Sequence, residues 1–255
     1  MSKDINNINK RRKTVLKISL AVNIVFIIIT IASIIFLAKN HYLPIVFQKI
    51  FGYKNDLSYI RNPVYKNSLA VYPMYQEQKN IVMLGNSLTS YANWSELLNR
   101  ADVANRGING DVTQGFISRL QYVINLQPKI CFIEGGINDI NNNISQAIIV
   151  ENLSKVIDTL QKYHIKPVLT TVTLLAKHFD YVSPINQNKQ IKELNKALLL
   201  LSKEKQISLL DLNKYVSDND FLKPSFATED GIHFTDKTYI VWKHEVEKIL
   251  QQEGL

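Results

Sequence analysis

The stretch Ile81-Val82-Met83-Leu84-Gly85-Asn86-Ser87 joins a short apolar run to a Gly-x-Ser turn. An uninterrupted apolar run that ends at a turn residue is typical of a strand buried on both faces. Further runs of this kind cover residues 103–105, 130–134, 167–172 and 207–211. Segments with a helical period separate them, over residues 94–99, 113–126, 145–164 and 191–205, and a last one covers residues 236–252. This alternation predicts an α/β fold in which helices cover both faces of a five-stranded parallel sheet.

Polar and glycine-rich segments follow these predicted strands. In open α/β sheets the ligand lies outside the carboxyl ends of the strands, so these segments are the first candidates for a functional site. Three of them come directly after strands, and the fourth lies in the last loop before the final helix; they cover residues 85–89, 105–111, 135–139 and 230–233. We therefore expect all four at one edge of the sheet.

The four segments contain the groups that nucleophilic catalysis requires. A serine hydroxyl is a weak nucleophile unless an oriented base removes its proton. Ser87 supplies the hydroxyl, His233 is the candidate base, and Asp230 is close enough in the chain to orient the imidazole. The backbone N–H groups of Ser87 and Gly110 and the side-chain amide of Asn138 are candidate donors to an oxyanion.

These residues resemble the SGNH hydrolases, also called the GDSL lipase/esterase superfamily. The family's four blocks occur here in order, as Gly85-Asn86-Ser87-Leu88, Gly110, Gly136-Ile137-Asn138-Asp139 and Asp230 to His233. The resemblance covers about residues 80–250 and implies a three-layer, flavodoxin-like fold with a Ser-His-Asp triad. Residues 105–113, with Gly115 and Arg119-Leu120, look most like the branch related to platelet-activating-factor acetylhydrolase and carbohydrate O-acetylesterases. Asn86 stands where the family's name-giving motif has Asp; this is not a triad position, so we expect activity to be retained.

Each motif also has a plain structural reading when it is taken alone. A Gly-x-Ser turn after a strand is common, Asn138-Asp139 is a suitable helix-capping pair, and residues 230–233 fit a loop with a surface histidine. The shared order and the shared position after strands favour the catalytic interpretation. His178 and Asp180 follow the fourth predicted strand, near the same edge, and are weaker candidates for substrate contact than for a solvated loop.

The N-terminal region predicts a membrane anchor. The net charge of the chain is +8, and +5 of it lies in the first 17 residues, where six Lys and Arg face only Asp4. No charged residue occurs from Ile18 to Ala38, a length that reaches about 31 Å as a helix and crosses a hydrocarbon core of about 30 Å. A cleaved signal peptide fits less well, because the apolar core of a signal peptide is usually shorter. Phe36-Leu37-Ala38 lacks the small residue at −3 of a cleavage site, and Thr30-Ile31-Ala32 is a weak candidate too early in the stretch. A buried core helix would show a polar face. The basic cluster predicts a cytoplasmic N-terminus and an extracytoplasmic remainder.

Four segments are expected along the chain. They are a basic cytoplasmic N-terminus (1–17), a transmembrane anchor (18–38), a membrane-proximal stalk that partly packs on the domain (39–79), and an SGNH hydrolase domain (80–255). The stalk contains Pro44, Pro63 and Pro73 and has no sustained period.

Composition excludes several other classes of protein. A hydrophobic fraction of 46% with only 20% charged residues excludes a disordered chain. Cys131 is the only cysteine, which excludes an intrachain disulfide and a Cys-based zinc site. The histidines are not clustered, so no metal is expected, and no phosphate-binding glycine loop indicates a nucleotide cofactor. The near-neutral body of the chain argues against a nucleic-acid partner.

The sequence favours a membrane-anchored extracytoplasmic serine esterase that removes a short acyl group, such as acetyl, from a carbohydrate or small-molecule ester. A long apolar lid between the blocks is absent, which disfavours long-chain lipase action. An acyl-enzyme can also be resolved by a sugar hydroxyl, so a cell-envelope O-acyltransferase is the first alternative. A non-catalytic binding module tethered to the envelope is the second, and the complete triad argues against it.

Overall fold

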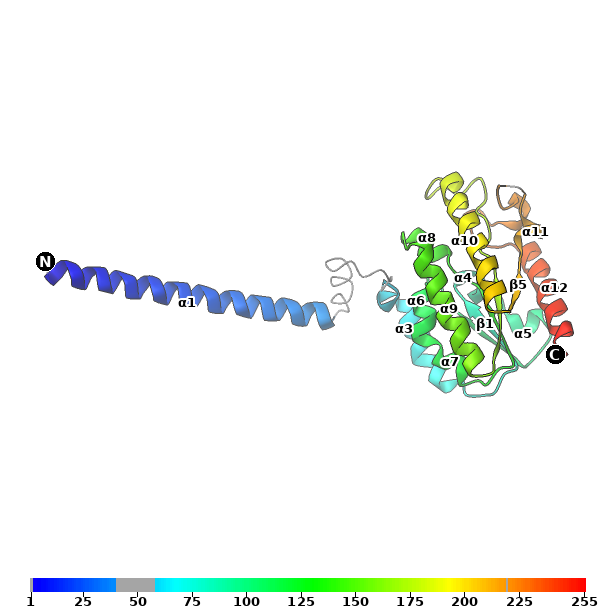
Figure 1. The fold of residues 1–255 in the computed structure, drawn as a ribbon, viewed down its shortest axis with the longest axis horizontal. Coiled ribbons are helices and arrows are strands. Elements are labelled where there is room, and N and C mark those ends of the chain that lie inside the picture. Colours follow the sequence, from blue (N-terminus) through cyan, green and yellow to red (C-terminus); the bar gives the residue numbers. More distant parts are fainter. Residues whose placement is uncertain (1, 40–57, 219) are drawn as a thin grey trace. The chain divides into compact units, whose positions relative to one another are not determined.

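The computed structural model describes residues 2–39, 58–218 and 220–255 (Figure 1). Five parallel strands in the described residues form one sheet in the order β2-β1-β3-β4-β5. The strands are β1 (Ile81–Gly85), β2 (Val103–Gly107), β3 (Ile130–Ile133), β4 (Lys166–Thr170) and β5 (Ser208–Leu210). The predicted α/β fold with a five-stranded parallel sheet is confirmed. The strand order reverses between β1 and β3, and a crevice forms at such a point, outside the carboxyl ends of the strands.

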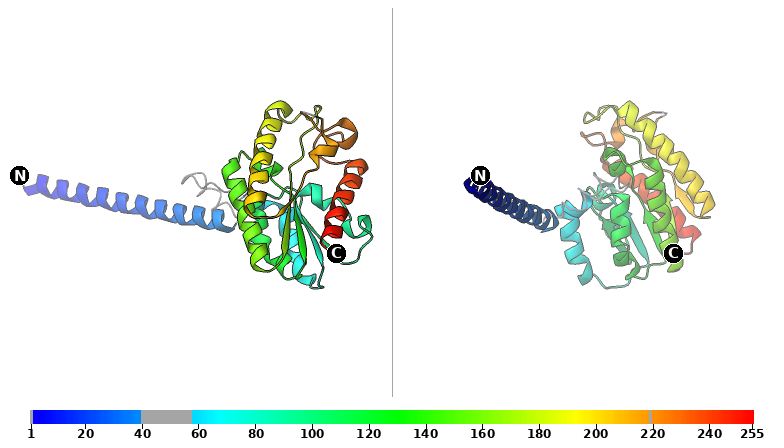
Figure 2. Two further views of the ribbon diagram at one scale, coloured as in Figure 1. Left: turned by 45° about the vertical axis from the view of Figure 1, so that its right-hand side comes forward. Right: turned by 60° about the vertical axis from the view of Figure 1, so that its left-hand side comes forward.

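Helices cover both faces of this sheet (Figures 1 and 2). Alternate residues of a strand point to opposite faces. In β1, Val82 and Leu84 join a core with α6 (Thr113–Arg119), α9 (Gln146–Lys162) and α10 (Pro184–Glu204). Ile81 and Met83 join a second core with α5 (Trp94–Leu97) and α12 (Asp236–Gln252). The helices of this part of the chain are α3 (Pro63–Val71), α4 (Ser87–Ser90), α5 (Trp94–Leu97), α6 (Thr113–Arg119), α7 (Gln121–Ile124), α8 (Ile137–Asn141), α9 (Gln146–Lys162), α10 (Pro184–Glu204), α11 (Asn213–Val216) and α12 (Asp236–Gln252), with 3-10 turns η1 (Ser58–Arg61), η2 (Tyr72–Met74) and η3 (Pro224–Phe226).

Two helices differ from their predicted bounds. The segment predicted as one helix over residues 113–126 is divided into α6 and α7 at Leu120. Helix α10 begins at Pro184, seven residues before the predicted start at Ile191. Its first two turns are mostly polar and exposed, so the apolar period does not reveal them, although proline suits the first turn of a helix.

The segment η1-α3-η2, residues 58–74, packs on the α/β unit. Three of its tyrosines, Tyr59, Tyr65 and Tyr72, are buried together with Ile108 and Val112, which lie between β2 and α6. The Tyr59 hydroxyl lies 2.6 Å from the hydroxyl of Ser118, and the Tyr65 hydroxyl donates to the carbonyl of Gly115 at 3.1 Å. Residues 58–74 belong to the segment predicted as a stalk, of which residues 40–57 lie outside the described residues.

Helix α1 (Ser2–Lys39) belongs to a separate unit, residues 1–53, which is described by itself. Its part from Val15 to Phe36 has a mean hydropathy of 2.7, and none of it is buried. By length and composition this helix can cross a membrane. It contains the predicted anchor over residues 18–38.

Candidate active site

Ser87 lies at the carboxyl end of β1, as the first residue of α4, and is partly exposed. Its neighbour Asn86 caps this helix, because the Asn86 Oδ1 accepts the Leu88 N–H at 2.8 Å. A Cβ at Gly85 would lie 2.0 Å from the Thr89 hydroxyl and 2.8 Å from the Glu134 carbonyl. Only glycine therefore allows the chain to turn this closely from strand to helix.

His233 and Asp230 lie beside Ser87, on the loop before α12. The Nε2 of His233 is 3.0 Å from the Ser87 Oγ, and its Nδ1 is 2.5 Å from an oxygen of Asp230. The other Asp230 oxygen accepts the backbone N–H groups of Ile232 and His233, each at 3.0 Å, and the hydroxyl of Thr228 at 2.8 Å. Thus the structure brings together the three residues predicted for the triad.

Asp230 is ionised at neutral pH. Partial burial acts to raise the pKa of its carboxyl group, but hydrogen bonds from the His233 ring and from the neighbouring N–H and O–H groups outweigh this and hold the pKa well below its usual range. A carboxylate at this place accepts the Nδ1 proton of His233. The Nε2 is then left free to accept the Ser87 proton.

Two further residues, Tyr91 and His178, lie beside this loop. The sequence offers His178 only as a weak candidate for substrate contact and does not single out Tyr91. The Tyr91 ring lies 5.0 Å from the His233 ring, centroid to centroid, and the residue is 56% exposed. His178 contacts the carbonyl of Thr228 at 3.0 Å through its Nε2. The latter contact ties His178 to the loop of Asp230 and His233.

The three predicted oxyanion donors lie on adjacent segments. Gly110 is exposed and has a φ of +73°, a conformation that favours glycine. Within the part of the chain that the structure describes, the N–H groups of Ser87 and Gly110 donate no hydrogen bond. Asn138, in α8, donates one Nδ2 hydrogen to the carbonyl of Asp111 at 2.8 Å, and its second hydrogen has no acceptor among the residues that the structure describes. All three groups therefore have a hydrogen to offer a ligand.

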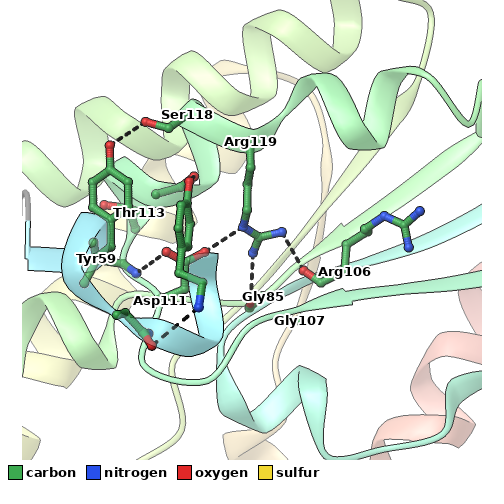
Figure 3. A network of polar contacts seen from close by, with 12 residues as sticks. Tyr59, Gly85, Arg106, Gly107, Asp111, Thr113, Ser118 and Arg119 are labelled. Carbon is green, nitrogen blue, oxygen red and sulfur yellow. Dashed lines mark hydrogen bonds and ion pairs between the residues drawn. The ribbon is translucent and has the colours of Figure 1, made fainter. Parts of the chain in front are cut away.

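A buried arginine joins the segments that carry these groups (Figure 3). Arg119 donates to the Asp111 carboxylate at 2.7 Å, to the carbonyl of Arg106 at 2.7 Å and to the carbonyl of Gly85 at 3.0 Å. The side chains of Arg119 and Asp111 are both 0% exposed. One guanidinium thus connects the end of β1, the end of β2 and the loop after Gly110. The sequence shows Arg119 only as part of a longer motif, because two of its three partners are backbone carbonyls, which any residue has.

Glu134 lies beside the turn at Asn86 and Ser87, and the sequence indicates only that it ends a strand. It is 3% exposed, and its carboxyl oxygens accept the Asn86 amide and the Thr89 hydroxyl, each at 3.3 Å. Burial raises the pKa of Glu134 to about 7, against the effect of these two hydrogen bonds. The side-chain amide of Asn86 donates a hydrogen bond to Glu134, and an ionised aspartate at position 86 would have no hydrogen to donate there.

Glu134→Gln is expected to flatten the dependence of stability on pH. The folded-state pKa of Glu134 lies above its unfolded value of 4.5, so its stabilising effect is complete below pH 4.5 and is lost as the pH rises through about 7. The whole shift corresponds to about 3 kcal/mol, of which about 2 kcal/mol is lost between pH 5.5 and 8.5. Gln resembles the neutral acid in shape and never ionises. Urea unfolding at pH 5.5 and 8.5 measures the difference, with the exposed Glu96→Gln as control; an equal pH dependence in parent and Glu134→Gln would contradict the assignment.

Comparison with known proteins adds a family match. Residues 79–240 match the model of the GDSL-like lipase/acylhydrolase family. The matched region includes Ser87, Gly110, Asn138, Asp230 and His233, and it begins after the η1-α3-η2 segment.

One curated relative and two solved structures define the range of similarity. The N-acylneuraminate cytidylyltransferase of Streptococcus agalactiae serotype V is 26% identical over 171 residues, which cover 64% of this chain and 37% of that protein. The chain thus spans little more than a third of the length of this relative. A GDSL-like lipase from Bacteroides thetaiotaomicron has 22% identity and a TM-score of 0.64, and the match covers 74% of this chain and 98% of that chain. The lipase/acylhydrolase from Enterococcus faecalis has 23% identity and a TM-score of 0.60, and the match covers 69% of this chain and 97% of that chain. These two likenesses show the fold.

Proposed function

Because the chain belongs to the GDSL-like lipase/acylhydrolase family, we propose that it is a membrane-anchored serine esterase that removes short acyl groups, such as acetyl, from a carbohydrate or small-molecule ester. The observation that carries this proposal is the hydrogen-bonded series Ser87, His233, Asp230. Its order and distances match those that activate a serine nucleophile.

The reaction proceeds in two halves. Ser87 Oγ attacks the ester carbonyl while His233 Nε2 takes the hydroxyl proton, and the resulting oxyanion accepts hydrogen bonds from Ser87 N–H, Gly110 N–H and the Asn138 amide. When the tetrahedral intermediate breaks its bond to the alcohol oxygen, His233 returns the proton to the leaving alcohol. Water then attacks the acyl-enzyme, giving its proton to His233, and the acid leaves as Ser87 regains that proton. Asp230 keeps the imidazole in the required tautomer throughout.

A carbohydrate substrate is supported by two observations. The exposed ring of Tyr91 beside His233 offers an aromatic face near the reacting groups, on which the apolar face of a sugar ring can pack. The curated relative carries in its name an N-acylneuraminate, which is an acylated sugar acid. A short acyl group agrees with the absence of a long apolar lid from the sequence between the family's blocks.

The substrate proposal is tested with the full chain in detergent. Acetylated sugars and aryl esters with acyl chains of increasing length are offered, and release of free acid is followed together with transfer of the acyl group to added sugar. Preferential release of acetate supports the proposal. Preference for long chains contradicts the short-acyl assignment, and transfer in excess of hydrolysis identifies the acyltransferase alternative.

We also propose that α1 crosses the membrane with its basic end in the cytoplasm and the catalytic unit on the other side. Six Lys and Arg residues before Ile18 support this orientation. A reporter that is active only in the cytoplasm, fused after Leu255, should be silent. An active reporter excludes the orientation.

Asn138→Ala is expected to lower kcat by about 10²–10³ with little change in KM, because the oxyanion exists only in the transition state. If Asn138 serves only to hold the carbonyl of Asp111, the cost is instead about 1 kcal/mol of stability with unchanged turnover per folded molecule. Asn138→Asp removes the donor to the Asp111 carbonyl as well and places a negative charge beside the oxyanion, so its kcat should fall at least as far as that of Asn138→Ala. Steady-state kinetics and melting temperatures of both variants give the answer; unchanged kcat in both would remove Asn138 from the site.

A further inference from the structure

We propose that Asn62, which lies before the region matched by the family model, is a positioning residue for the oxyanion donor at Gly110. The Asn62 Nδ2 donates to the carbonyl of Asn109 at 2.7 Å. This carbonyl and the N–H of Gly110 belong to the same peptide group. The proposal rests on the proposed function and adds a residue to its site.

The orientation of the Asn62 amide is fixed by its own helix. Asn62 is the N-cap of α3, and its Oδ1 accepts the backbone N–H groups of Val64 at 2.9 Å and Tyr65 at 3.4 Å. Since only the oxygen can accept, the nitrogen must face Asn109. The side chain is therefore held at both ends, by a helix terminus and by the Asn109 carbonyl.

The segment that carries Asn62 contacts α6 through one residue before Asn62 in the chain and one residue after it. Tyr59 meets Ser118 (Figure 3), and Tyr65 donates to Gly115, so the donor is attached to the same helix that follows the Gly110 loop. A Cβ at Gly110 would lie 3.1 Å from the Asn62 Nδ2, which shows how closely the two residues approach. No other side chain in the described part of the chain donates to the Asn109 carbonyl.

Two physical effects follow from this contact. In a trans peptide the C=O and the N–H point in opposite directions, so holding the Asn109 carbonyl fixes the direction of the Gly110 N–H. A hydrogen bond to the carbonyl also polarises the peptide and strengthens its N–H as a donor. Both effects stabilise an oxyanion more than a neutral ester, so Asn62 acts on kcat more than on KM.

Asn62→Ser tests this directly in the full chain. Serine keeps the helix cap but is too short to reach Asn109 and carries no charge. We expect kcat for an aryl acetate to fall on the order of tenfold, less than the 10²–10³ for loss of a donor itself, with KM nearly unchanged. The rate is expressed per serine titrated with an organophosphonate, so that misfolded protein does not count.

Tyr59→Phe is the matched control, because it removes the contact with Ser118 from the same segment and leaves Asn62 in place. It should lower the melting temperature and leave kcat unchanged. Unchanged kcat in Asn62→Ser, or an equal fall in both variants, would overturn the inference.

A second measurement does not depend on activity. We expect the chemical shift of the Gly110 amide to change in Asn62→Ser and not in Tyr59→Phe. A parent chain with no esterase activity would refute the proposed function alone, and the chemical shift would still decide the role of Asn62.

Discussion

Replacing Ser87 with alanine is expected to reduce ester hydrolysis by about 10⁶-fold, to the level supported by binding and the oxyanion donors alone. The Oγ that this change removes is the atom 3.0 Å from the His233 Nε2. Serine is not needed to hold the fold here, because the cap of α4 is supplied by Asn86 and the Ser87 side chain is partly exposed. The melting temperature should therefore stay close to that of the parent.

Ser90→Ala provides the control for this variant. Ser90 ends the same short helix and has no side-chain hydrogen bond within the described residues. Its alanine variant should retain nearly full turnover of a short aryl ester. Near-parental turnover in Ser87→Ala would remove Ser87 as the nucleophile, and a melting temperature far below that of the parent would show that the loss is structural.

The grouping of the candidate site residues could be predicted from the sequence because the strands of the sheet are parallel. Once the apolar run before Ser87 is read as a strand, the turn after it must lie at the carboxyl edge, where Asn138 also lies after β3. His233 lies 146 positions after Ser87, in the last loop before the final helix, and its place beside Ser87 was expected from the shared edge of the sheet together with the order of the family's blocks. The fold and the grouping of these residues were thus accessible without coordinates.

The residues that contact the candidate site residues from outside the motifs, such as Asn62 and Glu134, could not be predicted from the sequence in this way. The role of Asn62 depends on a short helix packing against the Gly110 loop, and no period or motif in residues 58–74 indicates that contact. Glu134 reads as a strand end until its burial under Asn86 is known. Side-chain bonds to backbone carbonyls leave no pattern in the sequence, because any residue has a carbonyl.

Arg119→Met is expected to lower the free energy of unfolding by about 3–5 kcal/mol, the largest effect on stability that we predict. The guanidinium makes three hydrogen bonds in a place where both its side chain and that of Asp111 are inaccessible to solvent. Methionine fills a similar length but leaves the Asp111 carboxylate unpaired and removes the donor to the carbonyls of Gly85 and Arg106. Arg100→Met is the matched control, since the Arg100–Asp102 pair is 29% exposed on both sides and should contribute about 1 kcal/mol at most.

The pH dependence of Arg119→Met separates an unpaired charge from a loss of packing. Burial already raises the pKa of Asp111 to about 6, and the attraction of Arg119 opposes this rise. Without Arg119 the folded-state pKa rises further above the unfolded value, so the stability of the variant should decrease more steeply with pH than that of the parent. Adding Asp111→Asn to Arg119→Met should remove the additional decrease of stability with pH, because asparagine does not ionise. The asparagine keeps an acceptor for the Val112 N–H. Urea unfolding of the parent and the single and double variants at pH 5.5 and 8 measures both effects. A loss that is the same at both pH values, and that Asp111→Asn does not reduce, would mean that Arg119 acts through packing and its bonds to the carbonyls rather than by neutralising Asp111.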